Sequence, residues 1–191
     1  MTCIILASGN SLDGFDFSKL KHDIFAINYM YKYCEPKYIF SWDAMSTKKL
    51  LSETDKIINT SSIAAKTIED QSRLIVWKLV YGNGLIREKQ SAVFYNGTVA
   101  FAINAAINLG YKTIYLLGCD NEIRNGKVHF YDTGEIPERQ LKRLPIAFNR
   151  FNWFYKQIAK ALKPDEKIIA VESSITVFEK MSMNEFINTL E

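Results

Sequence analysis

Short apolar runs alternate along the chain with longer segments in which apolar residues recur every three or four positions. The short runs are rich in β-branched residues and predict strands, at residues 2–7, 23–28, 38–43, 56–59, 74–80, 112–117 and 167–171. The longer periodic segments predict helices, at residues 44–54, 97–109 and 147–162. Strands that alternate with helices are typical of an α/β protein. We therefore expect a single Rossmann-like domain with a mostly parallel sheet and helices on both faces.

The helix expected at residues 147–162 has a clear apolar face. Phe148, Phe151 and Tyr155 share that face, and we expect it to pack on the core. Pro164 follows directly and marks the end of the helix, because proline cannot continue the hydrogen-bonding pattern.

Two further segments complete the expected domain, which spans residues 1–191. Ser182 and Glu185 have the spacing of a capping box, which predicts a helix near the end of the chain. Residues 61–73 fit neither the strand nor the helix pattern. We expect a lid or an irregular insertion within residues 61–95.

Small polar residues and glycines follow several predicted strands at the point where each strand ends, and others precede the helix at 97–109. Each of these tips alone is equally consistent with an ordinary turn. Because parallel strands end at one edge of a sheet, and ligands bind there, their convergence predicts a nucleotide site. The residues that we expect to bind the nucleotide are Ser8, Gly9, Asn10, Ser11, Asn28, Asp43, Asn96, Gly97, Thr98, Gly118 and Asp120.

The loop at residues 8–11 is the first of these tips. Gly9 allows a tight turn and a close approach to a ligand, and successive amides from Gly9 to Ser11 can surround an anion. The loop lacks the Lys-Ser/Thr of a Walker A motif and the further glycines of G-x-G-x-x-G. It therefore fits a phosphate or a ribose but does not indicate which base the nucleotide carries.

A second tip precedes the helix expected at residues 97–109. Asn96 or Thr98 would cap this helix and leave its free N–H groups facing an anion.

The segment N-G-K-V-H-F-Y-D, residues 125–132, contains one of the two histidines. His129 is suited to proton transfer near neutral pH. Tyr131 can donate a hydrogen bond to a departing phosphate, and Asp132 can orient His129. Arg124 and Lys127 can neutralise phosphate charge. The alternative is a surface turn with a partly buried histidine.

Composition describes a globular chain of 191 residues that is 48% apolar, with a mean hydropathy of −0.10. No apolar run approaches the length that crosses a bilayer, and no basic segment precedes the first apolar run as in a signal peptide. The cysteines are Cys3, Cys34 and Cys119, an odd number at wide spacing that fits reduced thiols in the cytoplasm. The net charge of +3 is too small to indicate nucleic-acid binding.

Several common site chemistries have no matching motif. The chain has no D-x-D pair of the kind that holds a metal and a nucleotide-sugar, no H-E-x-x-H motif, no zinc-type cysteine spacing and no G-x-S-x-G elbow. We therefore expect no metal ligands and no resident cofactor.

Five motifs together resemble a known family. They read, in chain order, SGNSL, FAINYMY, NGTVAFAINAAINLGYKTIYLLGCD, GKVHFYD and SSITVFEKMSMNEFI. In these motifs the chain resembles the bacterial sialyltransferases of glycosyltransferase family 42. It is also similar to DUF115-type relatives, which include phage-borne members and archaeal 6-hydroxymethylpterin diphosphokinases. The likeness covers most of the chain apart from residues 44–90.

The resemblance implies a variant of the GT-A fold and metal-independent transfer from a nucleotide-sugar, CMP-sialic acid in the sialyltransferases. It places the nucleotide at the 8–11 loop, at Asn28, at residues 96–98 and at Gly118 with Asp120. It places His129 and Tyr131 where a tyrosine helps the phosphate leave. The sialyltransferases use a histidine base in a later loop, and residues 133–152 contain no histidine.

Three functions therefore stay open at the level of sequence. The first is a glycosyltransferase-like protein that uses a nucleotide-sugar, with CMP as a candidate nucleotide. The second is a diphosphokinase or nucleotide hydrolase, which would need a divalent ion. The third is a non-catalytic protein, such as a phage protein, that binds or sequesters a nucleotide. The acceptor and the oligomeric state, a homo-oligomer included, are not determined by the sequence.

Overall fold

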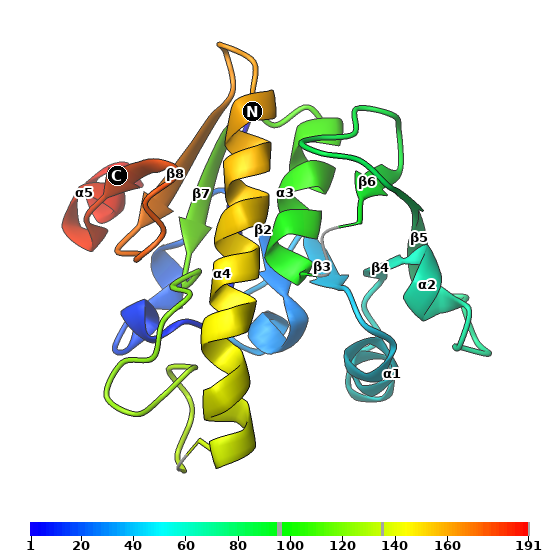
Figure 1. Ribbon diagram of the computed structural model, residues 1–191, viewed down its shortest axis with the longest axis horizontal. Helices are drawn as coiled ribbons and strands as arrows, with labels where there is room; N and C mark the ends of the chain where they lie inside the picture. Colours follow the sequence, from blue (N-terminus) through cyan, green and yellow to red (C-terminus); the bar gives the residue numbers. More distant parts are fainter. Residues whose placement is uncertain (95–96, 135, 191) are drawn as a thin grey trace.

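The computed structural model describes residues 1–94, 97–134 and 136–190. Its centre is a nine-stranded sheet in the order β6-β5-β4-β3-β2-β1-β7-β8-β9, and all neighbouring strands are parallel (Figure 1). The strands are β1 (Thr2–Leu6), β2 (Asp23–Ile27), β3 (Tyr38–Ser41), β4 (Ile58–Ser61), β5 (Leu74–Val80), β6 (Ser91–Val93), β7 (Thr113–Leu117), β8 (Lys167–Val171) and β9 (Glu179–Met181). The predicted α/β class and parallel sheet are confirmed.

The strand order reverses direction between β1 and β7. From β1 the chain adds β2 to β6 on one side, and it then returns to add β7 to β9 on the other side. Two loops that leave the sheet in opposite directions open a crevice at such a switch point, outside the carboxyl ends of the strands. The loops in question follow Leu6 and Leu117, which are paired across β1 and β7.

Helices cover both faces of the sheet. They are α1 (Ala44–Glu53), α2 (Ser62–Ala65), α3 (Thr98–Asn108), α4 (Glu138–Ala161) and α5 (Met183–Asn188), with short 3-10 helices η1 (Asn10–Leu12), η2 (Phe17–Lys19) and η3 (Asn28–Lys32). Strand β1 shows how the two faces are filled, because its side chains alternate. Cys3 and Ile5 belong to the core that α3 and α4 cover, whereas Ile4 and Leu6 belong to a second core under α5.

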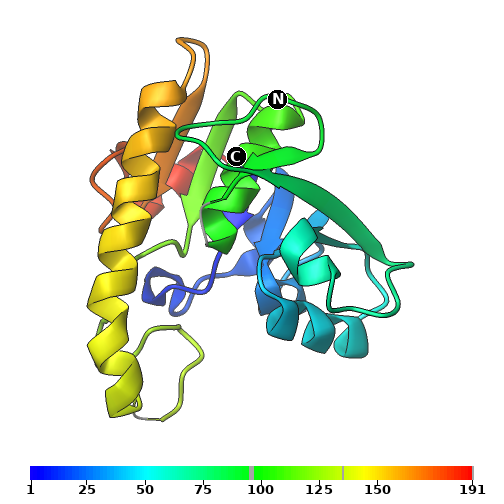
Figure 2. The ribbon, with the colours of Figure 1, turned by 45° about the vertical axis from the view of Figure 1, so that its right-hand side comes forward.

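Helix α3 is buried on nearly all sides, from Ala100 to Ile107. A helix that is apolar all round has to be buried, and Figures 1 and 2 show α3 with the sheet behind it and α4 beside it. Its buried Asn104 is satisfied, since its side chain accepts from the amides of Ile86 and Val93 and donates to the Ile86 carbonyl.

Three features of the fold differ from the expectation. Helix α4 begins at Glu138, nine residues before the predicted start, and continues through Pro145. Strands β6 and β9 are three residues each, too short for a clear periodic pattern. The segment 61–95, where the sequence predicts a lid or an irregular insertion, contains α2, β5 and β6, and the two strands extend the sheet.

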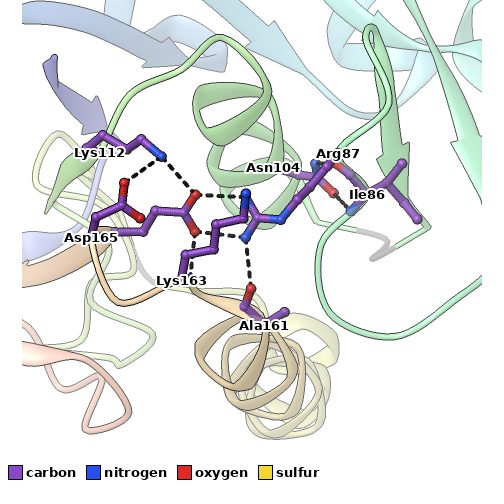
Figure 3. A network of polar contacts seen from close by, with 8 residues as sticks. Ile86, Arg87, Asn104, Lys112, Ala161, Lys163 and Asp165 are labelled. Carbon is purple, nitrogen blue, oxygen red and sulfur yellow. Dashed lines mark hydrogen bonds and ion pairs between the residues drawn. The ribbon is translucent and has the colours of Figure 1, made fainter.

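A polar network joins the loop between β5 and β6 to the far end of α4 (Figure 3). The Arg87 guanidinium donates to both carboxylate oxygens of Glu166, at 2.7 and 2.8 Å, and to the Ala161 carbonyl at 2.9 Å. Glu166 also accepts from the Lys163 amide, and its other cationic neighbour is Lys112, at 3.5 Å. These contacts lower the pKa of the buried Glu166 carboxyl to about 2, with the Arg87 hydrogen bonds as the largest cause.

We expect Glu166→Gln to lower the free energy of unfolding by about 2 kcal/mol at pH 7, because it removes charge-assisted hydrogen bonds. The Glu166 pKa is lower in the folded chain than its ordinary 4.5, so its stabilisation is present above that value. The stabilisation is lost as the pH falls toward about 2. Urea unfolding of the variant at several pH values should therefore show a shallower acid dependence than the wild type. Glu35→Gln, at an exposed carboxylate, is the control, and equal effects of the two changes would contradict this account.

Candidate functional site

A cavity of about 320 Å³ lies at the switch point, at the carboxyl ends of β1, β2 and β7. One wall is polar and comes mainly from the residues that follow these strands. That wall includes Ser8, Gly9, Asn28, Gly118, Asp120, Asn121, Glu122 and His129. The start of α3 and the inner face of α4 form the opposite, mainly apolar wall, with Gly97, Thr98, Val99, Gln140, Leu144, Phe148, Phe151 and Tyr155.

The loop after β1 is held to the loop after β7 by Asp120. Both carboxylate oxygens of Asp120 accept from Ser11, one from its amide at 2.7 Å and one from its hydroxyl at 2.6 Å. The Gly9 amide donates to the Gly118 carbonyl at 2.7 Å. The amides of Gly9 and Ser11 therefore already have partners within the chain, and in this arrangement they do not point to an anion.

Position 9 requires glycine because other atoms of the protein occupy the space that a side chain would need. A Cβ atom on Gly9 would lie 2.5 Å from the Asp120 carboxylate and 2.6 Å from the Gly118 carbonyl oxygen. The backbone of Gly9 is extended, with a φ of −63° and a ψ of 159°, so no conformational constraint demands glycine here. The required glycine reflects the close approach of the two loops.

His129 lies in the cavity wall and is held there by the β1 loop. Its Nδ1 is 2.8 Å from the Ser8 hydroxyl, and the next amide, of Phe130, donates to the Ser8 carbonyl. Asn10 adds a third link, because its side-chain amide donates to the Lys127 carbonyl at 2.7 Å. Burial lowers the pKa of His129 against a smaller opposing effect of Asp132. The imidazole is therefore neutral at pH 7 and able to accept a proton.

Tyr131 and Asp132 act on His129 in different ways. The Tyr131 ring is stacked on the imidazole with centroids 5.3 Å apart, and it also contacts the rings of Phe130, at 5.2 Å, and Tyr33, at 6.3 Å. Burial raises the pKa of the Tyr131 hydroxyl, which favours the protonated donor form. The Asp132 carboxylate accepts from the backbone amides of Val128 and His129. It thus orients the backbone around His129, and the contact to the imidazole comes from Ser8.

The N-terminus of α3 opens on the same cavity. Gly97 is its N-cap residue and provides no side-chain cap. The first amides of a helix have no partner within the helix. Those of Thr98 to Ala100 have no hydrogen-bond partner among the residues that the structure describes, and the helix dipole favours an anion there. Asn96, a predicted cap, lies outside the described residues.

Asn28 follows β2 and lines the cavity in a strained conformation. Its φ of +51° is left-handed, where asparagine is tolerated better than most residues. Its side-chain oxygen is buried and has no hydrogen-bond partner in the part of the chain that the structure describes. A buried acceptor without a partner is costly, and a ligand that donates to it would remove that cost.

Other predicted residues lie away from the cavity wall. Asp43 caps α1 by accepting from the Ser46 amide at 2.8 Å, because β3 ends two strands away from the switch point. The Arg124 guanidinium is paired with Glu122, and Lys127 contributes its backbone to a turn with Arg124. Neither cation is among the residues that line the cavity. Asn10 and Ser11 lie behind the wall and support it.

The inner face of α4 is the part of the site that sequence reasoning missed. Phe148, Phe151 and Tyr155 were expected to be core residues, and they also line the cavity. The stripe continues at the four-residue spacing through Leu144 and Gln140, which was the available signal, but these residues precede the helix start predicted at residue 147. Phe151 closes the cavity toward α3, since a Cβ on Gly97 would lie 3.0 Å from its ring.

Within residues 1–94, 97–134 and 136–190, no group of three or more His, Cys, Asp or Glu side chains is arranged to hold a metal ion. Cys119 lines the cavity, and burial raises its pKa, which keeps the thiol protonated. No described helix is both long and apolar enough for a membrane crossing.

The fold is similar to that of solved sialyltransferases. The sialyltransferase CstII from Campylobacter jejuni in complex with CMP-3FNeuAc aligns with a TM-score of 0.55 at 19% identity, over 96% of this chain and 87% of that chain. CstII in complex with a trisaccharide acceptor and CMP aligns with a TM-score of 0.54 at 19% identity, over 95% and 86% of the two chains. No protein-family model matches the sequence, and no curated protein matches it. At this identity the likeness shows a shared fold.

Proposed function

We propose that the chain is a glycosyltransferase-like enzyme that binds a nucleotide-sugar, with CMP as the nucleotide, and transfers the sugar without a metal ion. The observation that carries the proposal is that His129 and the free N-terminus of α3 line the same cavity. One group can accept a proton and the other can bind a phosphate, which are the two tasks of such a transfer.

Each wall of the cavity has a part in this proposal. The amides at the start of α3 bind the phosphate of the donor. The Asn28 side-chain oxygen accepts a hydrogen bond from the ribose or from an amino group of the base. The aromatic wall at Phe148 and Phe151 provides an apolar surface for a ring to pack on.

The chemical step follows from the state of His129. Its neutral imidazole takes a proton from the acceptor hydroxyl as the new glycosidic bond forms. The bond between the sugar and the phosphate breaks, and its electron pair leaves with the nucleotide. The developing negative charge is stabilised by the amides at the start of α3. When Nδ1 donates to Ser8, the lone pair on Nε2 is free for this role.

The similarity to sialyltransferases solved with CMP supports CMP as the first nucleotide to test. A diphosphokinase or hydrolase would bridge its phosphates with a divalent ion. Inhibition of turnover by EDTA would therefore favour that alternative. Tight nucleotide binding without turnover of any donor would favour a sequestering protein.

We expect CMP to raise the melting temperature by about 5 °C or more at a concentration near 100 Kd, because the ligand stabilises only the folded chain. Thr98→Glu should remove this shift. A carboxylate in the first turn suits the helix dipole but repels the phosphate. Thr176→Glu, at an exposed position elsewhere, is the matched control. If CMP, AMP, GMP and UMP all leave the melting temperature unchanged, the nucleotide site is refuted.

A further inference from the structure

The outward side of α4 is strongly basic. Between Glu138 and Ala161 the helix contains six Lys or Arg residues and one acidic residue, a net charge of +5. The whole chain has a net charge of +3, so the remainder has a net charge of −2. The positive charge is therefore concentrated on one helix.

These cations are exposed to the solvent. All six are exposed, and they are Arg139, Lys142, Arg143, Arg150, Lys156 and Lys160. In the described chain Lys142 has an ion pair, to the neighbouring Glu138, and none is formed by the other five. A cluster of unpaired cations creates a positive potential that attracts an anionic surface.

Two large apolar side chains lie among these cations. Ile146 is 64% exposed and Trp153 is 48% exposed. They are seven residues apart, so they lie on the same side of the helix. The residues that face the cavity, such as Leu144, Phe148 and Phe151, lie on the opposite side. We call the eight outward residues, the six cations with Ile146 and Trp153, the basic face.

The basic face is accessible along its whole length. Figure 2 shows α4 along one side of the molecule, and its first turns extend past the ends of the strands. Exposed apolar surface that is rimmed by charged residues is typical of sites that contact a partner or a membrane.

We propose that the basic face binds the surface of an anionic lipid membrane. Lys and Arg attract the anionic headgroups, while tryptophan and isoleucine enter the boundary between headgroups and acyl chains. A nucleic acid would satisfy the cations but would leave Ile146 without a partner. The chemistry of the face therefore favours a membrane over a polyanion in solution.

Membrane binding through this face would also orient the cavity. The same helix lines the cavity with its other side, at Gln140 and Leu144. The cavity would then lie next to the lipid surface, within reach of an acceptor that is bound to the membrane. The proposal itself depends on the basic face alone and not on the function of the cavity.

Vesicle sedimentation provides the test. We expect the full chain to sediment with vesicles of phosphatidylcholine containing 30% phosphatidylglycerol, and not with vesicles of pure phosphatidylcholine. The charge reversal Arg139→Glu, Lys142→Glu, Arg143→Glu should weaken binding by roughly 100-fold or more, since each cation near the surface contributes several-fold. The control is Lys21→Glu, Lys66→Glu, Lys89→Glu, which changes the net charge equally at exposed lysines on other elements.

Trp153 reports on the apolar part of the contact. Trp42 and Trp77 are buried, at 8% and 3% exposure, so only Trp153 can approach the lipid. Brominated phospholipids should quench its emission when the vesicles are anionic, and Trp153→Phe should remove the quenched component. Absence of binding to anionic vesicles, or equal binding by both triple variants, would overturn the proposal. Binding to DNA in solution together with unquenched Trp153 on vesicles would identify a polyanion site instead.

Discussion

Gly9→Val should destabilise the chain by about 3 kcal/mol and weaken CMP binding by roughly 100-fold or more, because overpacking here displaces groups that cannot move freely. The Cβ atom alone would lie 2.5 Å from the Asp120 carboxylate and 2.6 Å from the Gly118 carbonyl oxygen. The Gly118 backbone cannot retreat, because it has a φ of +67° and lies against the Ala7 carbonyl. Asp120 would have to leave Ser11, and the loop that holds His129 would lose its support.

Loss of binding and loss of folding can be distinguished with two further variants. Gly82→Val is the matched control, since a Cβ on Gly82 meets nothing within 4 Å and we expect no change. Ser11→Ala removes a single hydrogen bond to Asp120 and should cost about 1 kcal/mol, with a CMP affinity lowered several-fold. Melting temperature and CMP titration measure both quantities. Full CMP affinity in folded Gly9→Val would show that the junction of the two loops does not shape the site.

The local sequence was sufficient to predict those elements whose own residues determine where they begin and end. The bounds of β5 and β8 agree with the predicted strands, since each is a short, mainly apolar run rich in β-branched residues, interrupted only by Lys78 in β5 and preceded by Lys167 in β8. The capping box at Ser182 and Glu185 is formed as predicted. The start of α4 was missed because Pro145 lies inside the helix, where proline is unfavourable. The residues before Pro145 are mostly polar and exposed, so the apolar pattern is weak there.

The set of residues that line the site could not be predicted from local sequence, because it depends on the strand order and on contacts between distant segments. Asn28 and Asp43 both follow predicted strands and look equivalent in sequence. The strand order distinguishes them, because β2 is next to β1 at the switch point and β3 is one strand farther away. The partner of His129 is another example, since Ser8 is 121 residues earlier in the chain. Asp132, three residues away, was the nearer candidate and contacts the backbone instead.

Because the β1 loop is bonded to the β7 loop, several residues that were predicted to bind the ligand instead hold the cavity wall in position. Ser11 and Asn10 use their polar groups to hold Asp120 and the segment around Lys127. Within the described part of the chain, the Asn28 oxygen and the first amides of α3 have no internal partner, and these are the groups left for a ligand. The polar residues at the strand ends show where the site lies. The polar atoms without an internal partner in the described chain show which groups can contact a ligand.

His129→Gln should lower turnover of a CMP-linked sugar donor by roughly 100-fold or more while CMP affinity changes by no more than a few-fold, which is the usual contribution of a general base. The measurement is release of CMP from CMP-sialic acid, with and without added acceptor sugars. The matched control is His22→Gln, because His22 is the other histidine and is stacked on Tyr115, away from the cavity.

The pH dependence gives His129 a second signature. Its pKa is lowered by burial, so the imidazole remains neutral, and the rate should stay constant, as the pH falls below the ordinary value of 6.5. The rate should decline only once the pH reaches the lowered pKa. Ser8→Ala removes the hydrogen bond to Nδ1 and should lower turnover less than His129→Gln, with the pH at which the rate declines displaced from that of the wild type. Turnover that is equal in His129→Gln and His22→Gln would remove His129 from the mechanism.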